Sequence, residues 1–598
     1  MASRLTFNGR LSAAGALVAV LVFVVLGQVV GEYDVSLLTV AFIYGISAVS
    51  LDLVWGYVGA PDLGHGLWFG IGALTVGAMT TTTDSTGLVI SVQDEPWRYA
   101  VSLLLGIAIA AAVAGVVGRF AFSAKGSPFY IAVVTLALTT AATTLYSQFP
   151  TVTGGENGLF GFNPLTITTR AWYYLTLAAL VLVTAGALIL VRSDVGLLLR
   201  AVRDNEVRTR YLGYSVENVK TVTFMGGAGL AAFAGGLMAL ATGLVAADLF
   251  TFLFATQMMV WVAVGGRATI IGPVIGAIGL QLLGARLSGS FPTQWSLIQG
   301  LLFVLVVVFT PSGILPPLTR AFGRLLRRDA RADEREIVPE TTAPAPLPDK
   351  SPVISVSGLE FGYGSLQVLR GVDLKVQRGE LLCVVGPNGA GKSTLVSVLA
   401  DGNLSARGTV HYDLGAHTVD RRPPAHRLAR RGVSRKFQSP QLFESLSAAE
   451  TVLLARKAGR LPSFWRRSRR IPTSPAVLDV LEAMGLQGRD HEKSTSLAHG
   501  LKQGLEIAAS VASRPQVLLL DEPTAGLTHN ERAVVGTVLQ RLARGGMTII
   551  LIEHDLDFVN RIADRVVVLH EGRIIEDGTP AEVSNSDVVR EAYLGTVA

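Results

Sequence analysis

Charged residues are scarce in this sequence, and their scarcity argues against a wholly soluble protein. Asp, Glu, Lys and Arg make up 16% of the 598 residues, whereas soluble proteins average about 25%. Half of the residues are apolar, and the long apolar runs lie between positions 11 and 318. The dense charge follows Arg320. A chain of this length exceeds one hydrophobic core, so we expect a lipid-facing domain followed by a soluble one.

Cysteine is almost absent as well. The single cysteine, Cys383, excludes an internal disulfide, and its apolar neighbours predict a small core residue. The formal net charge is +6, but many of the Lys and Arg residues flank apolar runs, as in the cytoplasmic loops of membrane proteins. The charge therefore indicates a membrane topology, and we expect no nucleic-acid partner.

The apolar runs predict about ten membrane spans. The first, residues 11–31, is long enough to cross a bilayer and has no cleavage site after it, so we interpret it as a span and not as a signal peptide. The predicted spans are residues 11–31, 36–57, 64–82, 99–119, 128–148, 171–191, 221–244, 249–265, 269–287 and 295–312. Basic residues gather on one face of this arrangement, which predicts a multi-pass protein with both termini in the cytoplasm.

Glycine-rich stretches inside the spans, such as 66–70 and 226–236, predict close helix packing. Two polar residues in the spans are costly to bury. Asp52 predicts a functional or paired role, and we expect His65 to be a packing histidine in preference to a substrate ligand.

A domain boundary is predicted near residue 350. Residues 320–352 are basic, then acidic and rich in proline, which indicates a linker. From residue 353 onwards, short β-branched runs alternate with helical stretches. The expected fold is thus a polytopic α-helical membrane domain over 1–319, the linker, and an α/β domain over 353–598.

The residues from Gly386 to Ser393 match the phosphate-binding loop G-x-x-x-x-G-K-[ST] in full. The loop follows an apolar strand and opens an apolar helix, which is the context that the motif requires. Its glycines let backbone N–H groups surround phosphates. Lys392 is expected to contact the β- and γ-phosphates of ATP, and Ser393 to hold Mg²⁺.

A second motif, residues 517–522, ends a buried strand with two carboxylates. Asp521 is expected in the shell of the metal, and Glu522 is placed to activate the attacking water as general base. The two motifs together predict a nucleotide hydrolase.

With these motifs, residues 353–598 resemble the ATPases of ABC transporters. The resemblance implies that Tyr363, in preference to Phe361, stacks on adenine. It implies that Gln438 is a lid glutamine that senses Mg²⁺, and that His554 is a switch histidine at the γ-phosphate. The implied catalytic residues are Glu522, His554 and Gln438, and the implied metal ligands are Ser393, Gln438 and Asp521. The implied ATP-binding residues are Tyr363, Gly386, Asn388, Gly389, Gly391, Lys392, Ser393 and Thr394.

The signature segment departs from the family pattern Leu-Ser-Gly-Gly-Gln. Here it contains Ala498, His499 and Gly500, so the serine hydroxyl that donates to a γ-phosphate on the opposite cassette is missing. The family's D-loop aspartate is replaced by Thr528. We expect one of the two composite ATP sites to be weakened, and asymmetric hydrolysis is a hypothesis.

Three passages of the membrane half, residues 52–66, 125–158 and 196–214, resemble those of the permeases of branched-chain amino-acid and urea/amide importers. The last passage, a charged, helix-forming stretch between two predicted spans, is the most specific. It implies a coupling helix that docks on an ATPase. The implied coupling residues are Arg200, Arg203, Asp204 and Glu206.

Together the resemblances imply a natural fusion of permease and ATPase in the cytoplasmic membrane of a prokaryote. Its expected partners are a second permease, a second ATPase and an extracytoplasmic substrate-binding protein, since the sequence shows no domain of the last kind. Branched-chain amino acids and urea or short amides both stay open as substrates. An exporter fits less well, because the longest internal cytoplasmic segment is short, and a membrane-tethered regulatory ATPase without transport is the alternative of another class.

Overall fold

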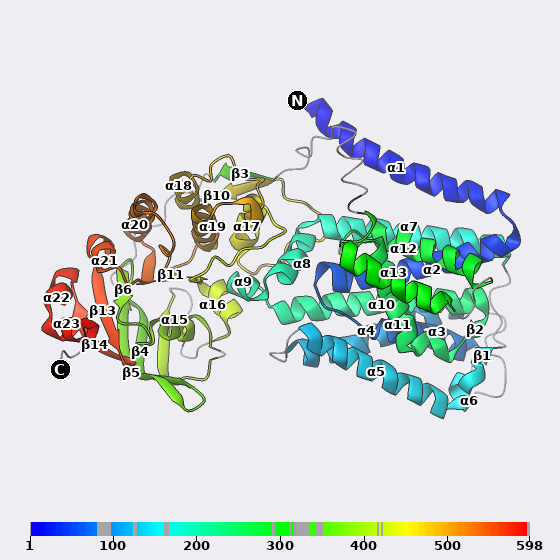
Figure 1. Ribbon diagram of the computed structural model, residues 1–598, viewed down its shortest axis with the longest axis horizontal. Coiled ribbons are helices and arrows are strands. Elements are labelled where there is room, and N and C mark those ends of the chain that lie inside the picture. The colour runs from blue at the N-terminus through cyan, green and yellow to red at the C-terminus, as the bar shows by residue number, and fades with distance from the viewer. Residues whose placement is uncertain are drawn as a thin grey trace. The chain divides into compact units, whose positions relative to one another are not determined.

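The computed structural model of the chain divides into two compact units (Figure 1). Unit 1 comprises Met1–Leu199 and Glu217–Asp333, and unit 2 comprises Arg200–Val216 and Glu334–Ala598. The residues that the structure describes are 2–80, 97–123, 128–160, 167–289, 294–310, 312–315, 317, 335–340, 351–402, 404–414, 418–419 and 423–594.

Unit 1 is helical, as the apolar runs predict. Its principal helices are α1 (Ala2–Val29), α2 (Glu32–Leu51), α3 (His65–Thr80), α4 (Trp97–Ser123), α5 (Pro128–Gln148), α7 (Thr169–Arg192), α10 (Val216–Thr242), α11 (Phe252–Gly265), α12 (Ile271–Ser288) and α13 (Trp295–Phe309). The shorter elements are the π-helix η1 (Asp52–Tyr57), α6 (Pro150–Thr153), the 3-10 turns η3 (Gly155–Asn157) and η4 (Ala247–Phe250), and the paired strands β1 (Leu159–Phe160) and β2 (Leu244–Val245). The helix α8 (Asp194–Asp204) begins in unit 1 and ends in unit 2.

Each of the ten predicted spans overlaps one of these principal helices. Six described helices are long and apolar enough to cross a membrane, and three more apolar helices are shorter. A membrane-embedded, multi-pass domain is therefore present, while the number ten stays a prediction.

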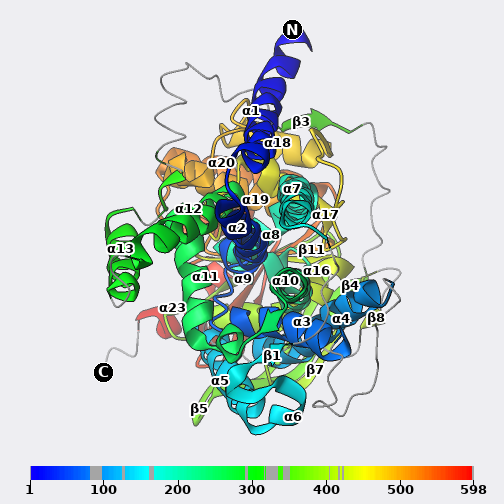
Figure 2. The ribbon, with the colours of Figure 1, turned by 90° about the vertical axis from the view of Figure 1, so that its right-hand side faces the viewer.

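Glycines set how closely the helices of unit 1 approach. A Cβ atom on Gly72 of α3 would lie 1.9 Å from the carbonyl oxygen of Ala232 in α10, and one on Gly235 of α10 would lie 1.9 Å from that of Phe69. The two backbones therefore touch only because both positions lack a side chain, as the glycine-rich stretches predict. Figure 2 views α7 and α10 nearly end-on, so the axes of these two long helices are roughly parallel.

Unit 2 is an α/β domain built on two sheets. The six-stranded sheet has the order β14-β13-β6-β12-β11-β9 and is parallel except for the β13–β14 pair. The four-stranded sheet, β5-β4-β7-β8, is antiparallel. The strands of the two sheets together are β4 (Pro352–Tyr363), β5 (Leu366–Gln377), β6 (Leu381–Val385), β7 (Arg407–Asp413), β8 (Thr418–Val419), β9 (Val433–Lys436), β11 (Val517–Asp521), β12 (Thr548–Ile552), β13 (Arg565–His570) and β14 (Arg573–Gly578).

The helices of unit 2 pack on these sheets and on one another. They are α9 (Glu206–Tyr211), α15 (Lys392–Ala400), α16 (Ala425–Arg431), α17 (Ala448–Lys457), α18 (Pro475–Ala483), α19 (His499–Ala512), α20 (His529–Arg544), α21 (Leu556–Ile562), α22 (Pro580–Asn585) and α23 (Asp587–Leu594), with the 3-10 turn η6 (Ser494–Ser496). The strands β6, β11 and β12 are buried along their whole length, which explains their continuous apolar sequences. Cys383 of β6 is fully buried, as expected.

The predicted linker differs from the structure in one place. Within residues 320–352, Glu336–Pro339 form the strand β3, which pairs in parallel with β10 (Arg470–Thr473). The short β-branched pair Ile337 and Val338 lies inside the charged, proline-rich stretch and suits a strand. Residues 320–334 and 341–350 of the predicted linker lie outside the described residues.

Candidate functional site

The phosphate loop joins β6 to the start of α15. Gly386, Gly389 and Gly391 have φ angles of 147°, 83° and 103°, in the region that residues with a side chain rarely adopt. At Gly386, a Cβ atom would lie 2.0 Å from the carbonyl oxygen of Leu569. The loop thus needs glycine, and it ends at a helix N-terminus, where N–H groups and the helix dipole favour an anion.

The cation of the loop is Lys392, the first residue of α15. Its Nζ donates to the carbonyl oxygens of Gly386 at 2.7 Å and Pro387 at 3.0 Å. Burial lowers the pKa of Lys392, and the carboxylates of Glu522 and Asp521 oppose that shift. Of the other predicted ATP-binding residues, Asn388 and Gly389 are exposed and Thr394 is half-buried in the first turn of α15. Because the ammonium of Lys392 donates to neutral carbonyl oxygens, it can transfer these hydrogen bonds to a phosphate.

The side chains of Glu522 and Gln438 meet because the two parallel strands before them end together. In the β11–β9 pair, Leu520 lies opposite Lys436, so the residues that follow both strands emerge at one edge of the sheet. There the Nε2 of Gln438 donates to Glu522 Oε2 at 2.8 Å. Glu522 has a φ of 44°, a conformation that non-glycine residues seldom adopt and that gathers at functional sites.

Asp521 contacts the phosphate loop directly. Its Oδ1 accepts a hydrogen bond of 3.2 Å from the hydroxyl of Ser393, and its Oδ2 lies 3.7 Å from a guanidinium nitrogen of Arg435. Burial raises the pKa of Asp521, and the cation of Arg435 counteracts the shift. The hydroxyl, carboxylate and amide oxygens of Ser393, Asp521 and Gln438 are the kind of donors that Mg²⁺ prefers. These three side chains therefore fit the predicted metal shell.

His554 and Tyr363 both have largely exposed side chains. His554 follows β12, the strand between β6 and β11, and its side chain is 62% exposed. The preceding Glu553 is buried and accepts a hydrogen bond of 2.7 Å from Thr524. Tyr363 is 58% exposed at the end of β4, whereas Phe361 is 6% exposed and packs in the core. Exposure thus favours Tyr363 as the residue available to stack on a base.

The signature segment forms the start of α19. Ala498 is the N-cap and makes no side-chain capping bond, since it lacks the hydroxyl. His499 Nε2 lies 3.2 Å from the carbonyl oxygen of Ala525, so it contacts the loop after β11 and not the phosphate loop. A Cβ atom on Gly500 would lie 2.5 Å from a carboxylate oxygen of Glu531. These residues present an open helix N-terminus at the surface of unit 2.

The replacement of the D-loop aspartate by Thr528 has a local explanation. Thr528 is the N-cap of α20 and forms a capping box with Glu531: its Oγ1 accepts from the Glu531 N–H, and the Glu531 side chain accepts from the Thr528 N–H. Such a pair satisfies two backbone donors at the helix start.

From Arg200 onwards, the predicted coupling segment belongs to unit 2. Arg200 pairs with Glu450 of α17 at 3.2 Å. Asp204 accepts hydrogen bonds from the backbone N–H and the hydroxyl of Ser445, at 2.7 and 2.6 Å. Arg203 pairs with the neighbouring Asp204 at 3.2 Å, and Glu206 lies 3.8 Å from Arg210 on its own helix. Among the predicted coupling residues, Arg200 and Asp204 therefore bind side chains and backbone of unit 2.

The deepest contact of the segment was not singled out from the sequence. Arg208 of α9 has no exposed surface. It donates to the carbonyl oxygen of Arg435 at 2.8 Å and to the hydroxyl of Ser510 at 3.1 Å, and its Nη1 lies 3.7 Å from Glu506 Oε1. Nothing in the local pattern distinguishes it from the other arginines of residues 196–214, because burial depends on what the helix meets in space.

Two further residues of the segment make hydrogen bonds within unit 2. Asn205, the N-cap of α9, donates to Gln441 at 2.7 Å, and the hydroxyl of Tyr214 donates to the carbonyl oxygen of Leu454 at 3.1 Å. The loop that contains Gln441 also carries Gln438. The coupling segment therefore contacts the same loop that contains Gln438.

Three buried charged side chains, Arg208, Glu506 and Lys436, form a cluster close to this loop. Burial lowers the pKa of Arg208 and raises the pKa of Glu506, and each charge opposes the shift of the other. Lys436 is also fully buried. Burial lowers its pKa to about 8, against the pull of the carboxylates of Glu506, Asp521 and Glu553. Glu506 Oε1 lies 3.5 Å from the backbone N–H of Phe437, directly before Gln438.

In unit 1, Asp52 and His65 are both satisfied by protein groups. Asp52 accepts hydrogen bonds from the backbone N–H groups of Ala268 and Ile270, at 2.6 and 2.9 Å, so the paired role is the one that the structure has. His65 is fully buried, with Nδ1 2.9 Å from Asp62 and Nε2 2.7 Å from Ser50. That geometry agrees with a packing histidine.

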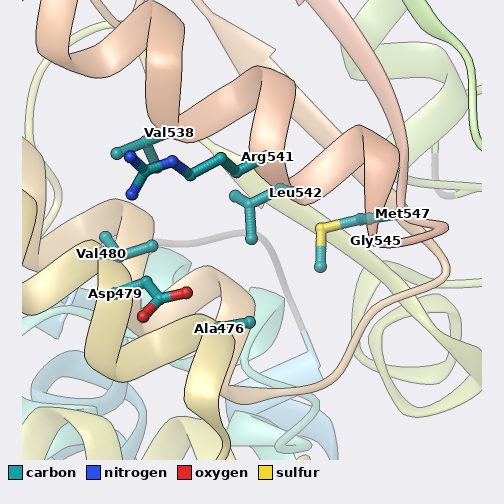
Figure 3. Close-up of a pocket in the computed structure, with 8 residues that line it drawn as sticks. All are labelled: Ala476, Asp479, Val480, Val538, Arg541, Leu542, Gly545 and Met547. Carbon is teal, nitrogen blue, oxygen red and sulfur yellow. The ribbon is translucent and has the colours of Figure 1, made fainter. Parts of the chain in front are cut away.

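A pocket elsewhere in unit 2 contains none of the predicted site residues. It lies between α18 and α20 and is lined by Ala476, Asp479, Val480, Val538, Arg541, Leu542, Gly545 and Met547 (Figure 3). The candidate site is instead the group of strand ends around the phosphate loop. There an ammonium, backbone N–H groups and oxygen donors can hold a phosphorylated ligand next to the carboxylate of Glu522.

Three family models match the chain. Residues 33–307 match the permease component of branched-chain amino acid transport systems, residues 369–525 match the ABC transporter family, and residues 573–598 match the branched-chain amino acid ATP-binding cassette transporter family.

Individual proteins resemble the second half. The high-affinity branched-chain amino acid transport ATP-binding protein BraF of Pseudomonas aeruginosa is 36% identical over 255 residues, which cover 41% of this chain and 98% of that protein. The corresponding protein LivG of Escherichia coli is 34% identical over 256 residues, with the same two coverages. A solved nucleotide-free cassette from an ABC transporter is 27% identical, covers 41% of this chain and 100% of that chain, and has a TM-score of 0.35.

Proposed function

Because the chain belongs to the branched-chain amino acid ABC transporter family and carries a permease and an ATP-hydrolysing cassette in one polypeptide, we propose that it imports branched-chain amino acids across the cytoplasmic membrane of a prokaryote. The names of the relatives BraF and LivG support this substrate class. Urea or a short amide is the alternative within the same family.

The observation that supports coupling of ATP hydrolysis to the permease is the position of residues 200–216. This segment lies between helices of the permease half, yet it folds with the cassette, and Arg208 is fully buried there. When the cassette moves, the segment must move with it, because a buried guanidinium cannot leave its partners without a large free-energy cost. Arg200, Arg203, Asp204 and Glu206 are proposed to transmit this movement.

In the proposed hydrolysis, the chain's residues hold the nucleotide and activate water. Tyr363 stacks on the base, and the loop N–H groups with Lys392 bind the phosphates. Glu522 orients and deprotonates the attacking water, and His554 contacts the terminal phosphate. Gln438, bonded to Glu522 at 2.8 Å, links the site to the coupling segment. A Mg²⁺ ion held by Ser393, Asp521 and Gln438 would neutralise phosphate charge.

The proposed assembly contains a second permease, a second cassette and an extracytoplasmic substrate-binding protein, with both termini of this chain in the cytoplasm. One composite ATP site would use Ala498, His499 and Gly500 of this chain. Since Ala498 offers no hydroxyl, we expect slower turnover at that site and asymmetric hydrolysis overall.

The test uses the complex reconstituted in proteoliposomes, with labelled leucine and labelled urea as probes. Lys392→Ala and Glu522→Gln should each lower ATP turnover and uptake together by at least about 100-fold, because each removes a group that acts in the transition state. Lys375→Ala and Glu591→Gln alter exposed residues and should leave both rates unchanged.

Each other outcome has a defined meaning. Uptake that continues when ATP turnover is lost would reject the transporter mechanism and favour a regulatory ATPase. Uptake of urea without leucine would replace the substrate proposal by its alternative.

A further inference from the structure

The strand β3 attaches the end of the predicted linker to the cassette. It lies in parallel beside β10 (Figure 1), and Glu336 pairs with Arg470 and Pro339 with Thr473. Backbone hydrogen bonds close both ends of the pair: the Glu336 N–H donates to the Arg469 carbonyl at 2.9 Å, and the Glu340 N–H donates to the Thr473 carbonyl at 2.9 Å. Strand addition of this kind binds an extended peptide through its main chain.

Side chains fix the register of the pair. Arg335, directly before β3, is 5% exposed, and its Nη1 donates to the Ser468 carbonyl at 3.0 Å. The N–H of Ile337 donates to Asp490 Oδ2 at 2.9 Å, so a backbone donor that does not face β10 is also satisfied. A buried arginine at one end and a specific acceptor in the middle exclude a shift by one residue.

The opposite end of the peptide is held by charge. Glu340 pairs with Arg456 of α17 at 3.4 Å and with Arg514, which follows α19. These two helices belong to the part of the cassette that also contacts the coupling segment. Six consecutive residues, 335–340, therefore contact β10, α17 and the loops around them.

One carboxylate contacts both the coupling segment and the linker peptide. Glu450, in the first turn of α17, lies 3.2 Å from Arg200 of the coupling segment and 3.6 Å from Arg335. Its other oxygen caps the helix by accepting from the Ser447 N–H at 3.2 Å. The cassette therefore binds the coupling segment and the linker peptide at the same residue.

We propose that residues 335–340 are a docking strap: a strand-forming peptide in the linker that follows the permease half, which the edge of β10 binds, so that the cassette stays attached to this peptide without depending on the covalent connection after residue 340. The strap adds a second, main-chain-based attachment beside the coupling segment and holds the α17 end of the cassette against that segment. The β10 edge therefore binds an extended peptide that begins with an arginine, here Arg335, and ends with a glutamate, here Glu340.

Two cleavage positions in the full chain test the strap. A specific protease site is inserted within residues 320–334 in one variant and within residues 341–350 in the other. After cleavage in detergent solution, the strap remains with the cassette in the first variant and with the permease half in the second. Both variants keep the coupling segment, so the comparison isolates the strap. The permease half is immobilised, and the release of the cassette is measured over time at several salt concentrations.

We expect cleavage after the strap to release the cassette at least roughly tenfold more slowly than cleavage before it, which is a modest effect for several hydrogen bonds and ion pairs. Arg335→Ala, or Ile337→Pro, which removes the donor to Asp490, should abolish the difference. Glu336→Ala changes an exposed residue of the same strap and should preserve it.

Equal release rates for the two cleavage positions at every salt concentration would overturn the proposal. Because that comparison needs no substitution, it holds even if a strap variant folds poorly. ATP turnover of the uncleaved variants shows whether the cassette itself is intact, and a loss of transport is not required for either outcome. The result is therefore independent of which solute the permease carries.

Discussion

Replacing Arg208 by methionine removes a cation that has no contact with water. The substitution leaves the carboxylate of Glu506 buried beside an apolar side chain, 3.7 Å from where the guanidinium stood. Two unit charges at that distance interact by about 4 kcal/mol at an effective dielectric constant of about 20. Loss of one partner of a buried pair costs about 3–5 kcal/mol. The two figures agree, so we expect the free energy of unfolding of the cassette to fall by about 4 kcal/mol.

Cys383 offers a direct assay in the full-length protein. It is the single cysteine of the sequence and is fully buried in β6. A thiol reagent can therefore label the chain only when the cassette opens, and the labelling rate reports the free energy of that opening. A loss of about 4 kcal/mol should accelerate labelling roughly 1,000-fold, since each 1.4 kcal/mol corresponds to a factor of ten.

A double variant separates the pair from general damage. Arg208→Met with Glu506→Met removes both charges and should restore most of the lost stability, because an apolar pair of similar size replaces a buried ion pair at little cost. Arg544→Met changes an exposed arginine on the last turn of α20 and should label like the unaltered chain. Equal labelling of Arg208→Met and Arg544→Met would refute the reasoning.

Two further expectations concern one residue in each unit. Burial lowers the pKa of Lys436 to about 8 from its ordinary 10.5, so between these pH values the unfolded chain binds more protons and the free energy of unfolding should rise with pH, by roughly 3 kcal/mol in all. Lys436→Met should flatten this pH dependence, which is measured as the rate of Cys383 labelling corrected for the reactivity of a free thiol. An unchanged slope would show that another group causes the pH dependence. In unit 1, a Cβ atom on Gly56 would lie 2.0 Å from Asp52 Oδ1, so Gly56→Ala should abolish uptake and lower the amount of protein in the membrane, whereas Gly186→Ala, which meets nothing within 4 Å, should not. Normal uptake by Gly56→Ala would show that the Asp52 contacts are dispensable.

The nucleotide site was accessible from the sequence because its chemistry depends on local order. The glycines of the phosphate loop, Lys392 and Ser393 are consecutive, and a strand before them and a helix after them suffice to position them. The meeting of Gln438 with Glu522 needed the resemblance, since the two residues are 84 positions apart. Parallel pairing of β9 with β11 is what brings them to one edge.

Other features could not be read from the chain. A short strand such as Glu336–Pro339 gains its stability from the partner that it pairs with, and β10 lies far away in the sequence. In the same way, the role of Asp52 depended on whether hydrogen-bond donors lay near its carboxylate, and the backbone of Ala268 and Ile270 supplied them.

By itself, the sequence determined that the chain has a membrane half and a nucleotide-hydrolysing half, because hydropathy and a contiguous phosphate loop are properties of neighbouring residues. Tertiary structure alone decided which arginine of the coupling segment is buried and that part of the linker is a strand of the cassette. Both outcomes depend on partners more than 100 positions away. Burial and strand pairing are properties of such partners, so no pattern within either segment specifies them.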